Sequence, residues 1–206
     1  MSDVKFIEQG HEIWGIFKND GYTEPHDFIA KVARVCYKSK STGAESDERL
    51  SRRLVEENHD AMVEHSFMSV KFVTNIGVSR EIIRHRLFSF AEQSTRYVNF
   101  NNKGFEFVLP NGLSEMQEKV MQTACKMCSW AYDLLIRLGL KPEMARSVLP
   151  LCTATNIVVS GNMREWRHFF DLRCDKRAHP QIRELANDLL DDVKQRVPVL
   201  FEDIQP

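Results

Sequence analysis

The sequence has no long hydrophobic run. Its longest apolar stretch without a charged residue covers residues 151–162, whereas roughly 20 residues are needed to cross a bilayer. The first residues, MSDVKF, lack the basic and then apolar order of a secretion signal. We therefore expect a soluble, cytoplasmic protein without a membrane partner.

The chain also lacks an excess of charge of either sign. It carries 28 Lys and Arg against 29 Asp and Glu, a formal net charge of −1 over 206 residues. This balance excludes a globally basic nucleic-acid coat and an acidic disordered tail, so the charge of any ligand must be met locally. The five cysteines are odd in number and scattered, which favours free thiols in a reducing compartment over a disulfide framework.

No internal repeat and no linker rich in Pro, Gly or Ser divides the chain, so we expect a single domain over residues 1–206. Strand and helix patterns come in blocks, which predicts an α+β fold with a central, mostly antiparallel sheet flanked by helices. Extended segments are predicted over residues 4–8, 12–17, 65–74, 96–109 (with a turn at 101–102) and 152–160. Helices are predicted over residues 27–35, 47–58, 77–87, 142–149, 162–172 and 180–196.

The longest predicted helix covers residues 114–139. Ser114 can cap its start, Gln117 completes a capping box, and Gly139 ends it. Apolar residues recur along it at helical spacing and are expected to face the core: Met116, Val120, Ala124, Met127, Cys128, Ala131, Leu134, Leu135 and Leu138. Met121 and Met144 are likewise expected to fill the core.

The densest chemical signal is a group of arginines within residues 80–96. Arg80, Arg84, Arg86 and Arg96 stand against only two acids, Glu81 and Glu92. Guanidinium groups this close repel one another unless an anion lies between them, and their planar geometry suits phosphate. The alternative is a solvated basic face, and composition alone does not decide between the two.

The spacing of these residues decides in favour of a ligand site. Arg84-His85-Arg86, Ser89, Ser94 and Arg96 form the pattern R-H-R-x-x-S-x-x-x-x-S-x-R, which resembles the signature of the flavin-dependent thymidylate synthases. Further blocks resemble that family in the right order: Glu64-His65, Ala145-Arg146 with Leu149-Pro150, and residues 161–173. The resemblance covers roughly residues 47–200.

The resemblance implies an activity. Members of this family convert dUMP to dTMP with the methylene group of methylenetetrahydrofolate, while FAD, reduced by NADPH, supplies the hydride. It also implies a homotetramer whose active sites form at subunit interfaces.

The resemblance also implies roles for matching residues. Three serve dUMP directly: Ser94 orients it, Arg146 clamps its phosphate, and Arg173 stabilises charge that develops on the uracil ring. The remaining matches are Glu92 and Arg96 for the ribose and phosphate of dUMP, and, for FAD, His59, Glu64, Arg84, His85, Arg86, Asn162, Arg164 and His168. Ser94 has no evident base partner, so we expect a hydrogen-bond donor and not a nucleophile.

Two positions depart from the family pattern. Glu81 replaces a glutamine that can donate to phosphate, and Arg177 replaces a histidine at the flavin site. An ionised Glu81 would repel phosphate, so we expect it either to pair with a neighbouring arginine or to make another contact.

Several residues suggest chemistry that we do not expect. Cys152 is interpreted as a buried strand cysteine and not as the thiolate of classical thymidylate synthases, and Cys125-x-x-Cys128 as helix packing. The seven histidines show no metal-binding spacing, so no metal is expected.

Two other functions stay open. The arginine group could serve a non-catalytic nucleotide- or nucleic-acid-binding module, although the balanced charge argues against nucleic acid. The chain could also be a flavoprotein that has lost its synthase chemistry.

Overall fold

The protein is described by a computed structural model that covers residues 3–17 and 24–205. It has the predicted α+β fold, with a four-stranded antiparallel sheet in the order β2-β3-β6-β4. These strands cover Gly10–Ile16 (β2), Phe67–Asn75 (β3), Ala154–Asn162 (β6) and Ser89–Glu92 (β4). In the described part of the chain, no helix is both long and apolar enough to cross a membrane.

Contacts divide the chain into two compact units. The first takes the described residues of 1–10, 72–84 and 91–158, and the second those of 11–71, 85–90 and 159–206. Strands β3 and β6 each contribute residues to both units. The expectation of a single domain over residues 1–206 stays a prediction.

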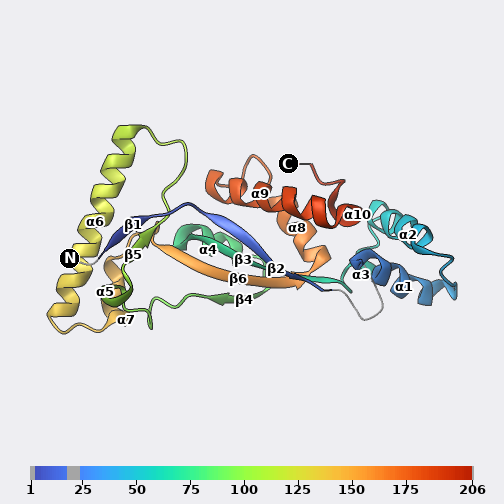
Figure 1. Cartoon of the computed structure of the whole chain (residues 1–206), viewed down its shortest axis with the longest axis horizontal. Coiled ribbons are helices and arrows are strands. Elements are labelled where there is room, and N and C mark those ends of the chain that lie inside the picture. Colours follow the sequence, from blue (N-terminus) through green and yellow to red (C-terminus); the bar gives the residue numbers. More distant parts are fainter. Residues whose placement is uncertain (1–2, 18–23, 206) are drawn as a thin grey trace. The chain divides into compact units, whose positions relative to one another are not determined.

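The first unit is built around an aromatic core. Strand β1 (Val4–Phe6) pairs in parallel with β5 (Phe105–Phe107), and both lie beside the long helix α6 (Glu115–Arg137) in Figure 1. Phe105 and Phe107 pack with Phe100 and with Tyr132 of α6. The remaining helical elements of this unit are α4 (Ile76–Ile82), α5 (Phe100–Lys103), α7 (Pro142–Ala145) and the 3-10 turn η1 (Arg146–Val148).

Helix α6 has the predicted capping. Ser114 Oγ accepts the Gln117 N–H, and the Gln117 side chain accepts the Ser114 N–H, so the capping box is confirmed. The predicted burial of its apolar stripe was wrong for most of its members: Cys125, Ser129 and Tyr132 face the core, and from the stripe Leu135 packs against it.

The exposed side of α6 carries much of the stripe that was expected inside. Met116 is 70% exposed, Met127 66% and Leu138 74%. Val120 and Leu134 are also exposed, as is Met144 on α7. An amphipathic pattern shows only that a helix buries one face, so it does not say whether the core or a partner covers that face.

The extended segment predicted over residues 96–109 was also wrong in part. Residues 100–103 form α5, and only residues 105–107 form a strand. Phe100 is buried against Phe105, and Gly104 ends the turn with φ at +83°, a conformation that glycine adopts without strain.

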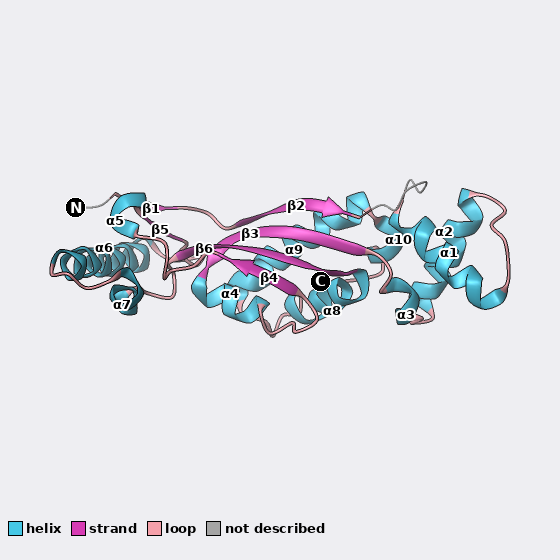
Figure 2. Cartoon of the chain, turned by 90° about the horizontal axis from the view of Figure 1, so that it is seen from below, coloured by secondary structure: helices cyan, strands magenta, loops and turns pink. Residues whose placement is uncertain are grey.

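The second unit is mainly helical. Figure 2 shows α1 (Pro25–Tyr37), α2 (Ala44–Glu56) and α3 (Asp60–Val63) grouped together. Helix α9 (Pro180–Arg196) packs on α8 (Met163–Arg173), and α10 (Pro198–Phe201) packs on α2. Helix α8 buries Trp166, Phe169 and Phe170.

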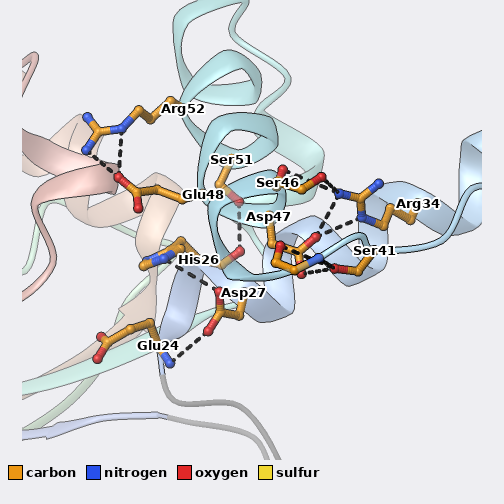
Figure 3. Close-up of polar contacts among 11 residues, drawn as sticks. Glu24, His26, Asp27, Arg34, Ser41, Ser46, Asp47, Glu48, Ser51 and Arg52 are labelled. Carbon is orange, nitrogen blue, oxygen red and sulfur yellow. Dashed lines mark hydrogen bonds and ion pairs between the residues drawn. The ribbon is translucent and has the colours of Figure 1, made fainter.

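Polar contacts fix the start of α2 and its packing on α1 (Figure 3). Arg34 donates through Nε to Asp47 Oδ1 at 2.9 Å and through Nη2 to Ser46 Oγ at 2.8 Å. Buried Ser51 donates to the carbonyl oxygen of His26 at 2.7 Å. The helix predicted over residues 47–58 begins earlier than expected, at Ala44, and ends at Glu56.

The helix predicted over residues 77–87 ends early. Helix α4 stops at Ile82, so Arg80 lies on the helix and Arg84 lies beyond its end. His85 and Phe88 are buried instead, against Phe169 and Trp166. The burial of these two rings turns the chain away from the helix axis and leads into β4, which the sequence pattern did not reveal.

Candidate active site

The first half of the signature folds as a tight turn that places a buried histidine. The Phe88 N–H donates to the His85 carbonyl at 3.1 Å, while Arg84 and Arg86 are exposed on either side of His85. The ring of His85 is 4% exposed and lies 5.1 Å from the Phe169 ring, centroid to centroid. The signature thus combines one inward imidazole with two outward guanidinium groups.

His85 contacts two charged side chains of α8. Arg173 Nε donates to His85 Nε2 at 3.0 Å, and His85 Nδ1 lies 3.5 Å from Glu165 Oε1. Burial, with smaller contributions from the charges of Arg173 and His168, lowers the pKa of His85 to about 4. His85 is therefore neutral at pH 7, and burial also raises the pKa of Glu165.

Two other predicted flavin residues meet although 100 positions separate them. Arg164 Nη1 donates to Glu64 Oε1 at 2.7 Å, and Arg164 Nε lies 3.2 Å from Asp60 Oδ2. His59 lies near another acid, with its Nε2 3.7 Å from Glu57 Oε2. This surface therefore gathers several charged side chains around the start of α8.

Asn162 marks the entrance to α8 and lines a cavity. Its Oδ1 accepts the Glu165 N–H at 2.8 Å, which caps the helix. The cavity has a volume of about 480 Å³ and is also lined by His65, Ser66 and Leu87. Among the described residues, Ser66 Oγ is buried without a hydrogen-bond partner. An orphaned hydroxyl in a cavity wall is suited to a polar ligand.

The second half of the signature lies in the first unit, beside η1. Arg146 donates through Nη1 to Thr95 Oγ1 at 3.0 Å and through Nε to the Glu143 carbonyl at 3.1 Å. Arg96 Nη2 lies 3.9 Å from Glu143 Oε2. Ser94 Oγ accepts the Arg96 N–H at 3.2 Å. Two arginines fifty positions apart are thereby brought to one exposed surface.

Glu92 is held separately in the same unit. Thr155 Oγ1 donates to Glu92 Oε1 at 3.1 Å, while Asn156 donates to Gln93 at 2.9 Å. These contacts join the end of β4 to β6 and fix the strand from which Ser94 and Arg96 follow.

The predicted site residues thus fall into two groups. Glu92, Ser94, Arg96 and Arg146 belong to the first unit. Arg173 belongs to the second, as do all the predicted FAD residues except Arg84. The convergence of all these residues on one cleft stays a prediction, as do their individual roles.

Sequence reasoning missed some of these participants. Glu165 was not singled out, although it precedes Phe169 and Arg173 by four and eight positions and therefore shares their helix face. An acid on a buried aromatic face is a usable signal, because buried carboxylates need partners. Thr95 and Glu143 gave no comparable signal.

The residues set aside from the site have ordinary environments. Arg177 is largely exposed and forms a two-pronged contact with Asp175 at 2.9 and 3.0 Å. All five cysteines are free, and Cys125 is buried in α6, which confirms the helix-packing interpretation. Cys152 lies in a turn before β6 and not within the strand, with its Sγ 3.4 Å from Cys125 Sγ.

Comparisons with known proteins agree with the signature. Residues 21–199 match the family described as thymidylate synthase complementing protein. A flavin-dependent thymidylate synthase of Geobacter sulfurreducens is 37% identical over 198 residues, which cover 89% of this chain and 83% of that protein. One from Pyrococcus furiosus is 32% identical over 203 residues, covering 90% and 79%.

A solved structure has the same fold. The UMP/dUMP methylase PolB from Streptomyces cacaoi, bound with 5-Br dUMP, superposes with a TM-score of 0.81 and covers 96% of this chain and 95% of its own. Its sequence identity is 23%, so this likeness concerns the fold alone.

Proposed function

Because the chain belongs to the flavin-dependent thymidylate synthase family, we propose that it catalyses the reductive methylation of dUMP to dTMP. The proposed one-carbon donor is methylenetetrahydrofolate, the reductant is NADPH, and the cofactor is FAD. When bound, FAD would carry the hydride, and the residues of the chain would bind and polarise the reactants.

The observation that carries this proposal is that Arg96 and Arg146 lie close together on one exposed surface. Both guanidinium groups approach Glu143, and Arg146 also binds Thr95. Two exposed guanidinium groups with a neighbouring hydroxyl are suited to the phosphate of dUMP. Glu92 ends β4 and Ser94 follows two residues later, and both would contact the nucleoside.

The residues of the second unit fit a flavin. Ser66 lines the cavity at Asn162, and its buried hydroxyl has no hydrogen-bond partner among the described residues. The exposed Arg86, and Arg84 of the first unit, carry the positive charge that a pyrophosphate requires. The Arg164 and Glu64 pair, with His59 and His168, would complete the binding surface. His65, which lines the same cavity, joins this set.

Arg173 is proposed to lie beside the uracil ring. A guanidinium group held by a neighbouring side chain needs little reorganisation when negative charge develops on the base. The contact between Arg173 and the buried His85 supports this role.

The exposed face of α6 supports the proposed homotetramer. Met116, Val120, Met127 and Leu138 lie on a helix whose other side is already buried in the first unit. Apolar side chains concentrated on one helix face favour coverage by another subunit. The proposed active sites would then form at the interfaces between subunits.

The test is release of tritium from labelled dUMP by the purified protein, with methylenetetrahydrofolate and NADPH, with and without added FAD. We expect a yellow protein and turnover that depends on all three substrates. Arg173→Ala should keep its flavin but lose about 100-fold or more of this turnover, whereas Arg196→Ala, a surface change on α9, should match the wild type. A colourless protein without dUMP-dependent turnover would contradict the function, and an active Arg173→Ala would remove that arginine from the site.

A further inference from the structure

Two buried side chains, His85 and Glu165, and the half-buried Arg173 form a chain of polar contacts at the proposed uracil site. His85 comes from the turn after α4, whereas Glu165 and Arg173 lie two helical turns apart on α8. Arg173 Nε is 3.0 Å from His85 Nε2, and Glu165 Oε1 is 3.5 Å from His85 Nδ1. The imidazole therefore stands between a cation and a carboxylate.

The donor pattern fixes where the single proton of the ring lies. An arginine has only N–H donors and no acceptor, so His85 Nε2 must accept and cannot carry a proton. The proton is then on Nδ1, the nitrogen that faces Glu165. Only this tautomer satisfies both contacts.

Burial makes the arrangement specific. His85 is 4% exposed and Glu165 5%, so water cannot readily replace either partner. The lowered pKa of His85 agrees with a neutral ring. Removing the acid from this environment would leave a buried N–H donor unsatisfied.

We propose that Glu165 and His85 are positioning residues, which hold the His85 proton on Nδ1 and thereby orient the guanidinium plane of Arg173 toward dUMP. The proposal rests on the function proposed above. Nε, Cζ and both Nη atoms of arginine lie in one plane, so a bond at Nε sets the direction in which the whole group points. His85 thus supports the site from inside, and the small exposed part of its ring limits a direct flavin contact.

The contacts of His85 with Glu165 and Arg173 explain why the signature contains both buried and exposed residues. Arg84 and Arg86 are exposed and are available to a ligand, whereas the histidine between them is buried. Substitutions at these three positions should therefore affect activity in different ways. Changes at His85 should act through Arg173 and not through charge.

Two pairs of variants separate the contacts. His85→Gln can place an amide oxygen near the position of Nε2 and keep the acceptor for Arg173, whereas His85→Asn reaches only the position of Nδ1 and loses it. Glu165→Gln keeps an acceptor oxygen for Nδ1–H, whereas Glu165→Leu removes it at similar volume. In each pair the first variant should keep more turnover than the second, because it keeps the contact that the second removes. The second should lose about 10-fold to 100-fold in kcat, with a small change in KM for dUMP and unchanged flavin content.

A direct readout does not depend on turnover. In ¹⁵N-histidine-labelled full-length protein at pH 7, the signal that disappears in His85→Gln should belong to a neutral ring with a protonated Nδ1. A protonated Nε2 or a charged ring would overturn the proposal, even if the enzyme is active. Equal kcat for folded, flavin-loaded His85→Gln and His85→Asn would overturn it as well. If Glu165→Leu does not fold, the His85 pair and the labelled wild type still decide the question. Failure of the proposed function is distinguishable, because the wild type itself would then lack dUMP turnover.

Discussion

Replacement of Gly161 by alanine tests how tightly the backbone just before α8 packs against Phe88, which lies within the signature. A Cβ atom at Gly161 would lie 2.2 Å from Phe88 Cδ1 and 2.6 Å from Phe88 Cε1, whereas ordinary contact begins at 3.4 Å. The ring would therefore have to retreat by about 1.2 Å in an interior that is already close-packed. Phe88 lies 4.5 Å from Trp166, centroid to centroid, so the ring has a large neighbour.

The expected cost follows from these distances. Overpacking of a buried site reduces the free energy of unfolding by about 1–3 kcal/mol. In a chain of this size, each kcal/mol lowers Tm by about 2–4 °C. Gly15→Ala is the matched control, because a Cβ there would meet nothing within 4 Å; it should leave stability nearly unchanged.

The assay is urea unfolding followed by circular dichroism at one fixed protein concentration, since a subunit interface would make stability depend on concentration. Phe88→Leu should relieve the clash, so the double variant with Gly161→Ala should be more stable than the sum of the single changes predicts, by about 1 kcal/mol. The reasoning is refuted if Gly161→Ala costs no more than Gly15→Ala. Strict additivity with Phe88→Leu would show that the ring is not the obstacle.

Three further outcomes are expected. Ser94→Ala should lower dUMP-dependent tritium release without abolishing it, because Ser94 is proposed to orient the nucleotide; complete loss in a folded, flavin-loaded variant would favour a nucleophile. Ser51→Ala should reduce the free energy of unfolding by about 1–3 kcal/mol, since the His26 carbonyl loses the donor that the buried Ser51 supplies; an unchanged urea midpoint would contradict this. The native pKa of His85, about 4, lies below its ordinary 6.5, so the native state binds fewer protons than the unfolded chain between these pH values and loses stability as pH falls. Compared with His85→Gln, the wild type should lose up to about 3 kcal/mol more between pH 7 and pH 4, and parallel urea profiles would exclude the effect.

The sequence predicted correctly those features that depend on interactions between residues close together in the chain. The Ser114 and Gln117 capping box fixed the start of α6 to the residue, because capping needs only backbone and side chains within one turn. Strand β4 was missed, because its four residues show no alternation and its pairing with β6 depends on a segment more than sixty positions away. Helix α4 was predicted too long for the same kind of reason, since the burial of His85 depends on α8.

The sequence by itself determined the family, the α+β class and the residue types of the site. The fixed spacing of arginine, histidine and serine can be recognised without knowing the fold. The tertiary structure decided which of these residues turn inward. It buried His85 between Glu165 and Arg173 and brought Arg96 to Arg146, and it left the apolar face of α6 exposed. These features depend on contacts between segments far apart in the chain and on the free-energy cost of burying a charge without a partner. Neither can be deduced from the spacing of neighbouring residues.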